Sequence, residues 1–245
     1  MRRFFSNAYK FYVYTVFILT LIPFYPLTVI LILSPKTRKW STFVFWIWSY
    51  VLSVLFVIYV RKNKIDTPKN PAVIIANHTS HLDIFLMYQI LPRRHIVFMG
   101  KHEILSYPLI KTYFKHLHIP VNRDDKRQAA QSMLTAKKKL SEGWSIVIFP
   151  EGGIPDNIAP ALAEFKAGAF ALAQKNNVAI IPITLHNHYK LLSEPQNLNG
   201  SAHPGFSKVT IHPYLDCNTV VNSDLSQLIE TSRNCIELAL NDLYF

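Results

Sequence analysis

Two long apolar runs open the chain, and shorter apolar segments follow them. Residues 11–35 hold no charged side chain, and neither do residues 40–60. As a helix, each run is long enough to cross a hydrocarbon core of about 30 Å. Pro23 and Pro26 stand near the middle of the first run, where they break or kink a helix. The pattern therefore predicts an N-terminal hairpin of two apolar helices.

From residue 65 onward, short apolar runs alternate with longer segments of helical periodicity. The strand-like runs are residues 72–76, 95–99, 145–149, 178–185 and 208–212, and the helical segments are residues 80–90, 107–116, 126–142, 161–175 and 223–243. Such alternation is typical of an α/β domain. We predict a mixed sheet flanked by helices at residues 65–245, preceded by a two-helix membrane-anchoring hairpin at residues 1–64.

Positive charge is concentrated in the predicted hairpin. Residues 1–65 hold nine of the 26 Lys and Arg residues and no acidic residue, since the first is Asp66. The rest of the chain is nearly neutral, with 17 basic and 15 acidic residues. Anionic lipid headgroups attract juxtamembrane cations, whereas a nucleic-acid-binding domain carries a basic stripe that this remainder lacks. We expect membrane lipid as a partner and no nucleic acid.

The sequence leaves two arrangements of the hairpin open. Cations at both of its outer ends favour two membrane-spanning helices with cytoplasmic ends. The two prolines, together with aromatic residues gathered at one end of the second run, are also typical of a hairpin that enters only one leaflet. Those aromatic residues are Trp40, Trp46, Trp48 and Tyr50. In both arrangements we expect the α/β domain on the cytoplasmic side of a membrane.

A histidine and an aspartate follow the first predicted strand. His78 lies two residues after the run 72–76, and Asp83 lies five residues further on. On an ideal helix five positions turn about 500°, so both side chains face one site only if His78 precedes the helix and Asp83 sits in its first turns. Thr79 or Ser80 is then the expected N-cap. A histidine oriented by a carboxylate is a general base, and open α/β sheets bind ligands at this end of their strands.

Three further groups of polar residues or glycines follow predicted strands. Lys101 and Arg123 are cations that can each hold a phosphate. Glu151 can accept hydrogen bonds from a hydroxyl or an arginine, and the two glycines after it can offer backbone N–H groups to an anion. These glycines are Gly152 and Gly153, and a third cation, Lys166, precedes Gly168. Together, Lys101, Arg123 and Lys166 can neutralise a phosphomonoester.

In their order and spacing, these groups resemble the motifs of the phospholipid acyltransferase family typified by 1-acyl-glycerol-3-phosphate acyltransferase. The resemblance covers residues 72–183 and includes the pair Ile181-Pro182. It implies that His78 and Asp83 are catalytic. It also implies that Arg123 and the Glu151-Gly152 motif hold the glycerol phosphate of a lysophospholipid acceptor, and that the hairpin docks the enzyme on a membrane.

The chain departs from the family pattern directly after Gly152. The family usually continues with Thr or Ser and then Arg, whereas Gly153 and Ile154 occupy these positions. One expected phosphate-binding cation is therefore missing. Another lysolipid headgroup remains an alternative acceptor.

The implied reaction suits the residues. We expect transfer of a fatty acyl group from acyl-CoA or acyl carrier protein to the sn-2 hydroxyl of 1-acyl-glycerol-3-phosphate, which gives phosphatidic acid without a further cofactor. A thiol of pKa near 8.5 leaves far more readily than an alkoxide, so a base such as His78 suffices and no enzyme nucleophile is needed. We expect backbone N–H groups at the start of the following helix to stabilise the oxyanion.

Two other classes of protein compete with this interpretation. A metal-dependent hydrolase would use histidines and Asp83 as ligands, although their spacing matches no standard metal motif. The histidines are His78, His81, His186 and His188. A membrane-anchored lipid-binding or scaffolding protein can share the same fold. Cys217 and Cys235 match neither a zinc motif nor a disulfide framework, and we expect no metal.

Overall fold

A mixed sheet forms the centre of the computed structural model, which describes residues 2–155, 159–194, 197 and 199–242. Within these residues the strand order is β1-β7-β6-β2-β5-β3-β4. The strands are β1 (Ile58–Lys62), β2 (Ala72–Ala76), β3 (Ile96–Lys101), β4 (Ile119–Val121), β5 (Ser145–Ile148), β6 (Ala179–Leu185) and β7 (Gly205–Ile211). Strands β6 and β7 are antiparallel, and the other neighbours are parallel. The predicted mixed α/β fold is confirmed.

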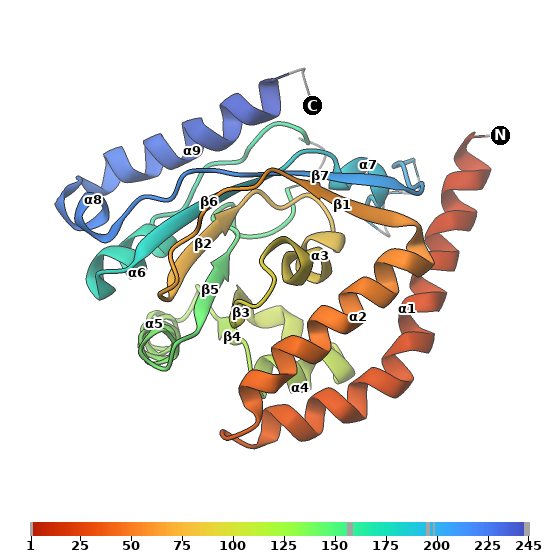
Figure 1. Ribbon diagram of the computed structural model, residues 1–245, viewed down its shortest axis with the longest axis horizontal. Coiled ribbons are helices and arrows are strands. Elements are labelled where there is room, and N and C mark those ends of the chain that lie inside the picture. The colour runs from red at the N-terminus through yellow and green to blue at the C-terminus, as the bar shows by residue number, and fades with distance from the viewer. Residues whose placement is uncertain (1, 156–158, 195–196, 198, 243–245) are drawn as a thin grey trace.

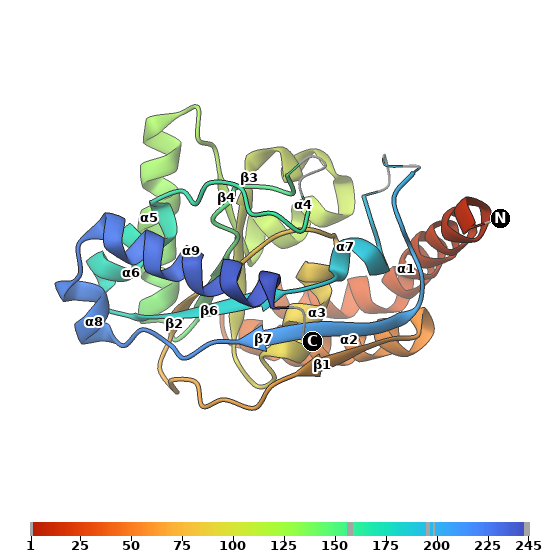
Figure 2. The ribbon, with the colours of Figure 1, turned by 90° about the horizontal axis from the view of Figure 1, so that it is seen from above.

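Helices cover both faces of the sheet (Figures 1 and 2). One group consists of α5 (Lys126–Ser141), α6 (Gly168–Asn176), α8 (Cys217–Asn222) and α9 (Leu225–Asn241). The other consists of α1 (Arg2–Leu33), α2 (Ser41–Phe56), α3 (Leu82–Ile90) and α4 (Pro108–His116), with short 3-10 helices at Arg38–Trp40 and His102–Ser106. A short helix, α7 (His188–Leu191), follows β6. Strands β2, β5 and β6 are buried along their whole length because helices lie on both sides of them.

The five predicted strands match β2, β3, β5, β6 and β7, with ends that differ by up to three residues. Two strands were not predicted, β1 and β4. The expectation of one helix over residues 40–60 is wrong, because α2 ends at Phe56 and Val57 adopts a left-handed conformation with φ 55°. The chain then enters β1, which pairs in parallel with β7. This pairing partner is distant in sequence, so the local apolar pattern gives no sign of it.

The helix predicted over residues 161–175 is also shorter than expected. It begins only at Gly168, as α6. In the preceding segment the N–H of Ala163 donates to the Glu151 carboxylate, and the N–H of Lys166 donates to the carbonyl of Pro150. These bonds tie the segment to the end of β5 and replace the helical ones. The end predicted at residue 243 for the last helix lies outside the described residues.

The two N-terminal helices pack directly on the sheet domain. Trp48 and Leu52 of α2 are almost fully buried in the common core. The Ser49 hydroxyl donates to the carbonyl of Phe85 at 2.7 Å, and the Gln89 amide donates to the carbonyl of Ser49 at 2.7 Å, so α2 is bonded to α3. The division of the chain after residue 64 stays a prediction, but α2 and β1 share the core of the domain.

The outer surface of this hairpin is apolar. Two helical stretches, Arg3–Leu33 in α1 and Arg38–Phe56, which joins the first 3-10 helix to α2, are long and apolar enough to cross a membrane by length and composition. Helix α1 contains Pro23 and Pro26 without interruption and is visibly bent (Figure 1). The exposed large apolar residues of the two helices include Phe4, Phe5, Phe11, Ile18, Leu19, Ile22, Ile30, Leu33, Phe43, Tyr50 and Val54. Water is a poor solvent for so large a continuous surface.

Candidate active site

His78 and Asp83 meet in a hydrogen bond at the C-terminal end of β2. The Nδ1 atom of His78 lies 2.7 Å from Oδ2 of Asp83. His78 lies in the loop before α3 and Asp83 lies in its first turn, as the five-residue spacing requires. Asp83 is fully buried, whereas the His78 side chain keeps 13% of its surface exposed. A ring placed in this way presents one nitrogen to a buried carboxylate and leaves the other for a ligand.

The carboxylate of Asp83 is the centre of the loop's hydrogen bonds. Its Oδ2 also accepts from the N–H groups of Thr79 at 2.8 Å and Ser80 at 3.0 Å. Its Oδ1 accepts from Nδ1 of His188 at 2.5 Å. Burial raises the pKa of Asp83, but the hydrogen bonds from His188 and His78 outweigh it and hold the pKa well below its usual range. Asp83 is therefore an anion at neutral pH.

Ser80, one of the two expected N-caps, makes a capping bond at the start of α3. His81 directly precedes α3 and makes no side-chain capping bond, whereas the Ser80 hydroxyl accepts from the N–H of Leu82 at 3.1 Å. The carboxylate of Asp83 reaches back to the N–H groups of Thr79 and Ser80 and closes the turn. A helical acid can satisfy N–H groups before its own helix, and this one does so while it binds His78.

Backbone N–H groups near the start of α3 were expected to stabilise the oxyanion, but most of those in this loop are already bonded within the protein. The N–H of His78 donates to Glu151, and those of Thr79 and Ser80 donate to Asp83. Further along, the N–H groups of Leu82 and Asp83 donate to the side-chain and carbonyl oxygens of Ser80. Groups that are already bonded inside the protein do not stabilise charge on a substrate. These five N–H groups are therefore not the donors.

Neighbouring strands hold the His78 loop in place. The side chain of Asn77 accepts from the N–H of Leu185 at 2.8 Å and donates to its carbonyl at 2.9 Å, which fixes the end of β2 to the end of β6. The ring of His78 stacks on Phe149 with centroids 4.0 Å apart. The N–H of His78 donates to Oε1 of Glu151 at 2.7 Å. Contacts to both adjacent strands thus fix the backbone and the ring plane.

The carboxylate of Glu151 connects the His78 loop to the segment before α6. Its second oxygen, Oε2, accepts from the N–H of Ala163 at 3.0 Å. Burial raises the pKa of Glu151, while the backbone bonds from Ala163 and His78 partly offset this effect. The resemblance assigned Glu151 to acceptor binding, and that assignment stays a prediction. The contacts present hold the His78 loop against the segment that leads to α6.

Three predicted cations converge over the turn after β5. Gly152 has φ +91°, and a Cβ added there would lie 2.2 Å from Nη1 of Arg123 and 2.9 Å from Nζ of Lys166. A Cβ on Gly153 would lie 3.3 Å from Nζ of Lys101. The positive charge of Arg123, then burial and then the charge of Lys101 lower the pKa of Lys166. Cations that repel one another in this way form a site for an anion.

The sheet explains why these residues meet. Strands β2, β5, β3 and β4 are neighbours in that order, and His78, Gly152, Lys101 and Arg123 stand at or just beyond their C-terminal ends. Adjacent strands lie about 4.8 Å apart. His78 and the cations are therefore spread along one edge over roughly 5–15 Å. Among the described residues, the ion pairs include none of the three cations Lys101, Arg123 and Lys166.

His188 is the residue of this site that sequence reasoning missed. It is fully buried on α7, and its Nε2 lies 2.5 Å from the hydroxyl oxygen of Ser207 on β7. The sequence offered it only as one of several alternative metal ligands. Both His78 and His188 direct Nδ1 at Asp83 at hydrogen-bond distances. Within the described part of the chain, no group of three or more His, Cys, Asp or Glu side chains has the arrangement of a metal site.

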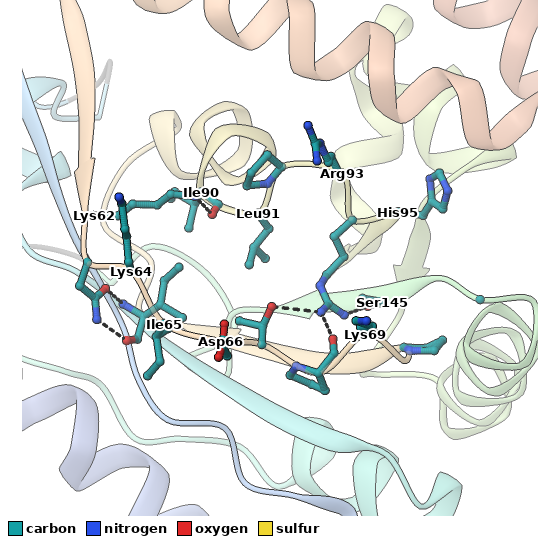
Figure 3. Close-up of a pocket in the computed structure, with 18 residues that line it drawn as sticks. Lys62, Lys64, Ile65, Asp66, Lys69, Ile90, Leu91, Arg93, His95 and Ser145 are labelled. Atoms are coloured by element: carbon teal, nitrogen blue, oxygen red, sulfur yellow. Dashed lines mark hydrogen bonds between the residues drawn. The ribbon is translucent and has the colours of Figure 1, made fainter.

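A separate hollow of about 690 Å³ opens at the other end of the sheet. Figure 3 shows that the linker after β1 and the loop before β3 form its walls, with Lys64, Asp66 and Lys69 on one side and Arg93 on the other. The guanidinium of Arg94, which also lines this hollow, donates to the carbonyl of Asn70 and to the hydroxyl of Ser145. No predicted site residue lines this hollow, so it is distinct from the site at His78.

Comparisons with known proteins agree with this geometry. The model of the family described as Acyltransferase matches residues 57–186. A 1-acyl-sn-glycerol-3-phosphate acyltransferase of Chlamydomonas reinhardtii is 30% identical over 185 residues, which cover 75% of this chain and 53% of that protein. A chloroplastic 1-acyl-sn-glycerol-3-phosphate acyltransferase of Arabidopsis thaliana is 29% identical over 186 residues, which cover 75% and 51%. The chain thus spans about half the length of these curated relatives.

A solved structure shares the whole fold. The crystal structure of the 1-acyl-sn-glycerophosphate acyltransferase PlsC from Thermotoga maritima superimposes with a TM-score of 0.77 and covers 99% of this chain and 98% of its own. The two sequences are 20% identical. At this identity the likeness shows the fold alone, which includes the N-terminal helices as well as the sheet.

Proposed function

The chain belongs to the acyltransferase family, and we propose that it transfers a fatty acyl group from an acyl thioester to the sn-2 hydroxyl of 1-acyl-glycerol-3-phosphate, which yields phosphatidic acid. One observation carries the proposal. The cationic cluster at Gly152 begins one residue after Glu151, whose carboxylate binds the N–H of His78. A base and an anion site thus lie next to each other, as a hydroxyl and a phosphate do on one glycerol.

His78 acts as the general base in this proposal. Its Nδ1 proton is held by Asp83, so Nε2 is free to take the proton of the acceptor hydroxyl. The hydroxyl oxygen then attacks the thioester carbonyl carbon, and a tetrahedral intermediate forms. When this intermediate collapses, the carbon–sulfur bond breaks and the imidazolium returns its proton to the departing thiolate. The ester and the free thiol are the products, and no covalent enzyme intermediate is needed.

The three cations bind the phosphate of the acceptor. Arg123 offers a planar guanidinium that binds phosphate through two parallel bonds, whereas Lys101 and Lys166 act as point charges. The family pattern expects an arginine where Ile154 stands. Lys166 lies next to Arg123 over the same turn and supplies positive charge in the place of that arginine. The donor is an acyl thioester of coenzyme A or of acyl carrier protein.

The hairpin lies along the membrane and inserts into one leaflet. The packing of α2 supports this arrangement, because α2 has buried residues from Ser41 to Phe56 and is bonded to α3 through Ser49, and a helix held in this way cannot leave the domain to span a bilayer. The exposed apolar faces of α1 and α2 fit an interfacial helix pair. Not all of the hairpin's cations face lipid, since Lys10, Arg38 and Lys62 donate to backbone carbonyls. The sheet domain lies on the cytoplasmic side.

Complementation tests the proposed function. A bacterial strain that lacks its own lysophosphatidate acyltransferase should grow when it expresses this chain, and not when it expresses the His78→Ala variant at the same level. Lipid analysis of the survivors gives the acceptor and the acyl chain. Purified protein should consume acyl-CoA or acyl carrier protein thioester with 1-acyl-glycerol-3-phosphate. Failure of growth, together with no thioester consumption for any lysolipid, would favour a membrane-anchored lipid-binding protein instead.

A further inference from the structure

Two histidines share the carboxylate of Asp83, and only one of them faces the proposed substrate site. His78 binds Oδ2 at 2.7 Å and His188 binds Oδ1 at 2.5 Å. His188 and Asp83 are fully buried. We infer that His188 is a positioning residue, which fixes Asp83 and through it the tautomer and orientation of His78. The inference rests on the proposed function for its kinetic consequence, but not for its structural one.

The hydrogen bonds define where the protons are. An ionised carboxylate only accepts, so both histidines donate from Nδ1. In the neutral ring of His188, Nε2 then accepts from the hydroxyl of Ser207 at 2.5 Å. A serine hydroxyl can donate or accept, so the same contact also suits a protonated ring. The order Ser207, His188, Asp83, His78 is thus a continuous chain of hydrogen bonds from β7 to the base.

The second histidine controls the angle of the carboxylate. Oδ2 accepts from His78 and from the N–H groups of Thr79 and Ser80, whereas His188 is the side chain that donates to Oδ1. Without His188, Oδ1 would be a fully buried acceptor that has lost its strong partner, and such an atom turns toward any other donor or water. Because the carboxylate turns as one plane, that rotation would strain the bonds to Oδ2, including the one from His78. The position of the base therefore depends on His188.

The support for His188 comes from a distant part of the chain. The side chain of Asn187 donates to the carbonyl of Phe206 at 2.9 Å and accepts from the N–H of Lys208 at 2.9 Å. These bonds fix the start of α7 to β7, and Ser207 binds the ring between them. A buried histidine ring that is bonded at both nitrogens, on a helix whose start is fixed to β7, has little freedom to rotate. This is the environment expected of a residue that orients another group.

The kinetic experiment compares residues 1–245 with four variants at His188, Ser207 and His212, and the transfer reaction proposed above is the readout. His188→Leu removes the donor to Asp83. His188→Asn keeps one, because its amide nitrogen lies close to the position of Nδ1. Ser207→Ala removes only the bond to Nε2. His212→Leu is the matched control, since His212 is a largely buried histidine whose Nε2 binds the hydroxyl of Thr184 at 2.8 Å.

We expect His188→Leu to lower kcat by roughly 10–100-fold, the order found for outer partners of a functional histidine. The KM values of both substrates should stay within about twofold. His188→Asn should restore most of kcat, and Ser207→Ala should lose less than His188→Leu. In an Asp83→Asn background, His188→Leu should have no further effect. A wild-type kcat in His188→Leu would overturn the inference.

A second measurement needs no substrate. Nitrogen-15 NMR of the imidazole rings reports which nitrogen of His78 carries the proton. In the wild type and in His188→Asn we expect the Nδ1–H form, and in His188→Leu a mixture of both forms. If His188→Leu does not fold, the proton position on His78 is compared between His188→Asn and Ser207→Ala instead. An unchanged Nδ1–H form in His188→Leu would refute positioning, whereas a wild type that shows this form but transfers no acyl group would refute only the proposed function.

Discussion

Replacement of Gly152 with alanine tests the cationic cluster. Gly152 has φ +91°, and a left-handed conformation costs an L-residue roughly 1–2 kcal/mol. The new Cβ would lie 2.2 Å from Nη1 of Arg123 and 2.9 Å from Nζ of Lys166. Both atoms end flexible side chains, so they can move away. We expect the free energy of unfolding to fall by roughly 1–2 kcal/mol, with the protein still folded.

The effect on activity should be larger than the effect on stability. A hydrogen bond to a charged group contributes roughly 1.5–3 kcal/mol, and about 1.4 kcal/mol corresponds to a tenfold change in affinity. Displacement of Arg123 and Lys166 should therefore raise the KM of the lysophospholipid by roughly 10–100-fold. The KM of the acyl thioester should change little, because the cluster binds the phosphate of the acceptor in the proposed function.

Gly168 offers a matched control for this substitution. It is the first residue of α6, and a Cβ added there would meet nothing within 4 Å. Alanine also favours a helix over glycine by roughly 1 kcal/mol. Gly168→Ala should therefore keep both KM values and unfold at the same or a higher denaturant concentration. Steady-state kinetics with each substrate varied in turn makes the comparison. A wild-type acceptor KM in folded Gly152→Ala would refute the role assigned to the cluster.

Three other predictions concern the base, a buried lysine and the hairpin. His78→Ala should abolish transfer, while Asp83→Asn should keep a small residual rate because the ring then adopts the required tautomer only part of the time; initial rates of folded variants decide, and near-normal turnover of His78→Ala would contradict the mechanism. Burial, and then the charge of Arg38, lower the pKa of Lys139 to about 8 from 10.5. Because the unfolded chain keeps this proton to higher pH, the free energy of unfolding should rise between about pH 8 and 10.5, and Lys139→Met should remove that rise in denaturant unfolding. Ile22→Glu, on the exposed face of α1, should weaken sedimentation with anionic liposomes, whereas Leu134→Glu, equally apolar and exposed but on α5, should not; equal binding of both variants would contradict docking through the hairpin.

Deletion of the hairpin cannot replace these substitutions. Residues 1–64 include β1, which pairs with β7, and α2, whose Trp48 and Leu52 are buried in the core. A truncated protein would expose these core contacts and lose an edge strand. Loss of activity would then report unfolding as well as detachment from the membrane. Single changes on the outer face of α1 separate the two effects.

Local patterns predicted the parts of the fold that local contacts decide. The run at residues 72–76 is fully buried as β2, and its apolar composition alone indicates this. The spacing from His78 to Asp83 predicted their contact because both lie on one short loop and helix start. In contrast, β1 depends on pairing with β7, and the non-helical stretch before α6 depends on the carboxylate of Glu151. Strands β1 and β7 are too far apart for any local window, and the bond from Ala163 to Glu151, which spans 12 residues, follows no periodic pattern.

The same reasoning explains why His188 was missed. Its partner Asp83 is 105 residues away in sequence, and no motif links the two. The five backbone N–H groups of the His78 loop were expected to be free for a substrate, but the sequence does not show that Asp83, Glu151 and Ser80 accept from them. Both errors concern hydrogen-bond partners. A sequence pattern can indicate which residues are polar, but the fold decides which of them are already satisfied.

The hairpin also contacts the His78 loop, so the proposed docking surface and the proposed base belong to one packed unit. The hydroxyl of Tyr14 on α1 lies 3.4 Å from Nδ1 of His81, three residues after His78. On the same helix, Phe11 and Ile18 are exposed apolar residues. In the proposed function, a membrane that takes up these two side chains therefore lies beside the loop that carries the base. A lysolipid in that membrane would then present its hydroxyl to His78 while its acyl chain stays in the bilayer, and this geometry gives a reason for an anchor that is packed into the core of the domain.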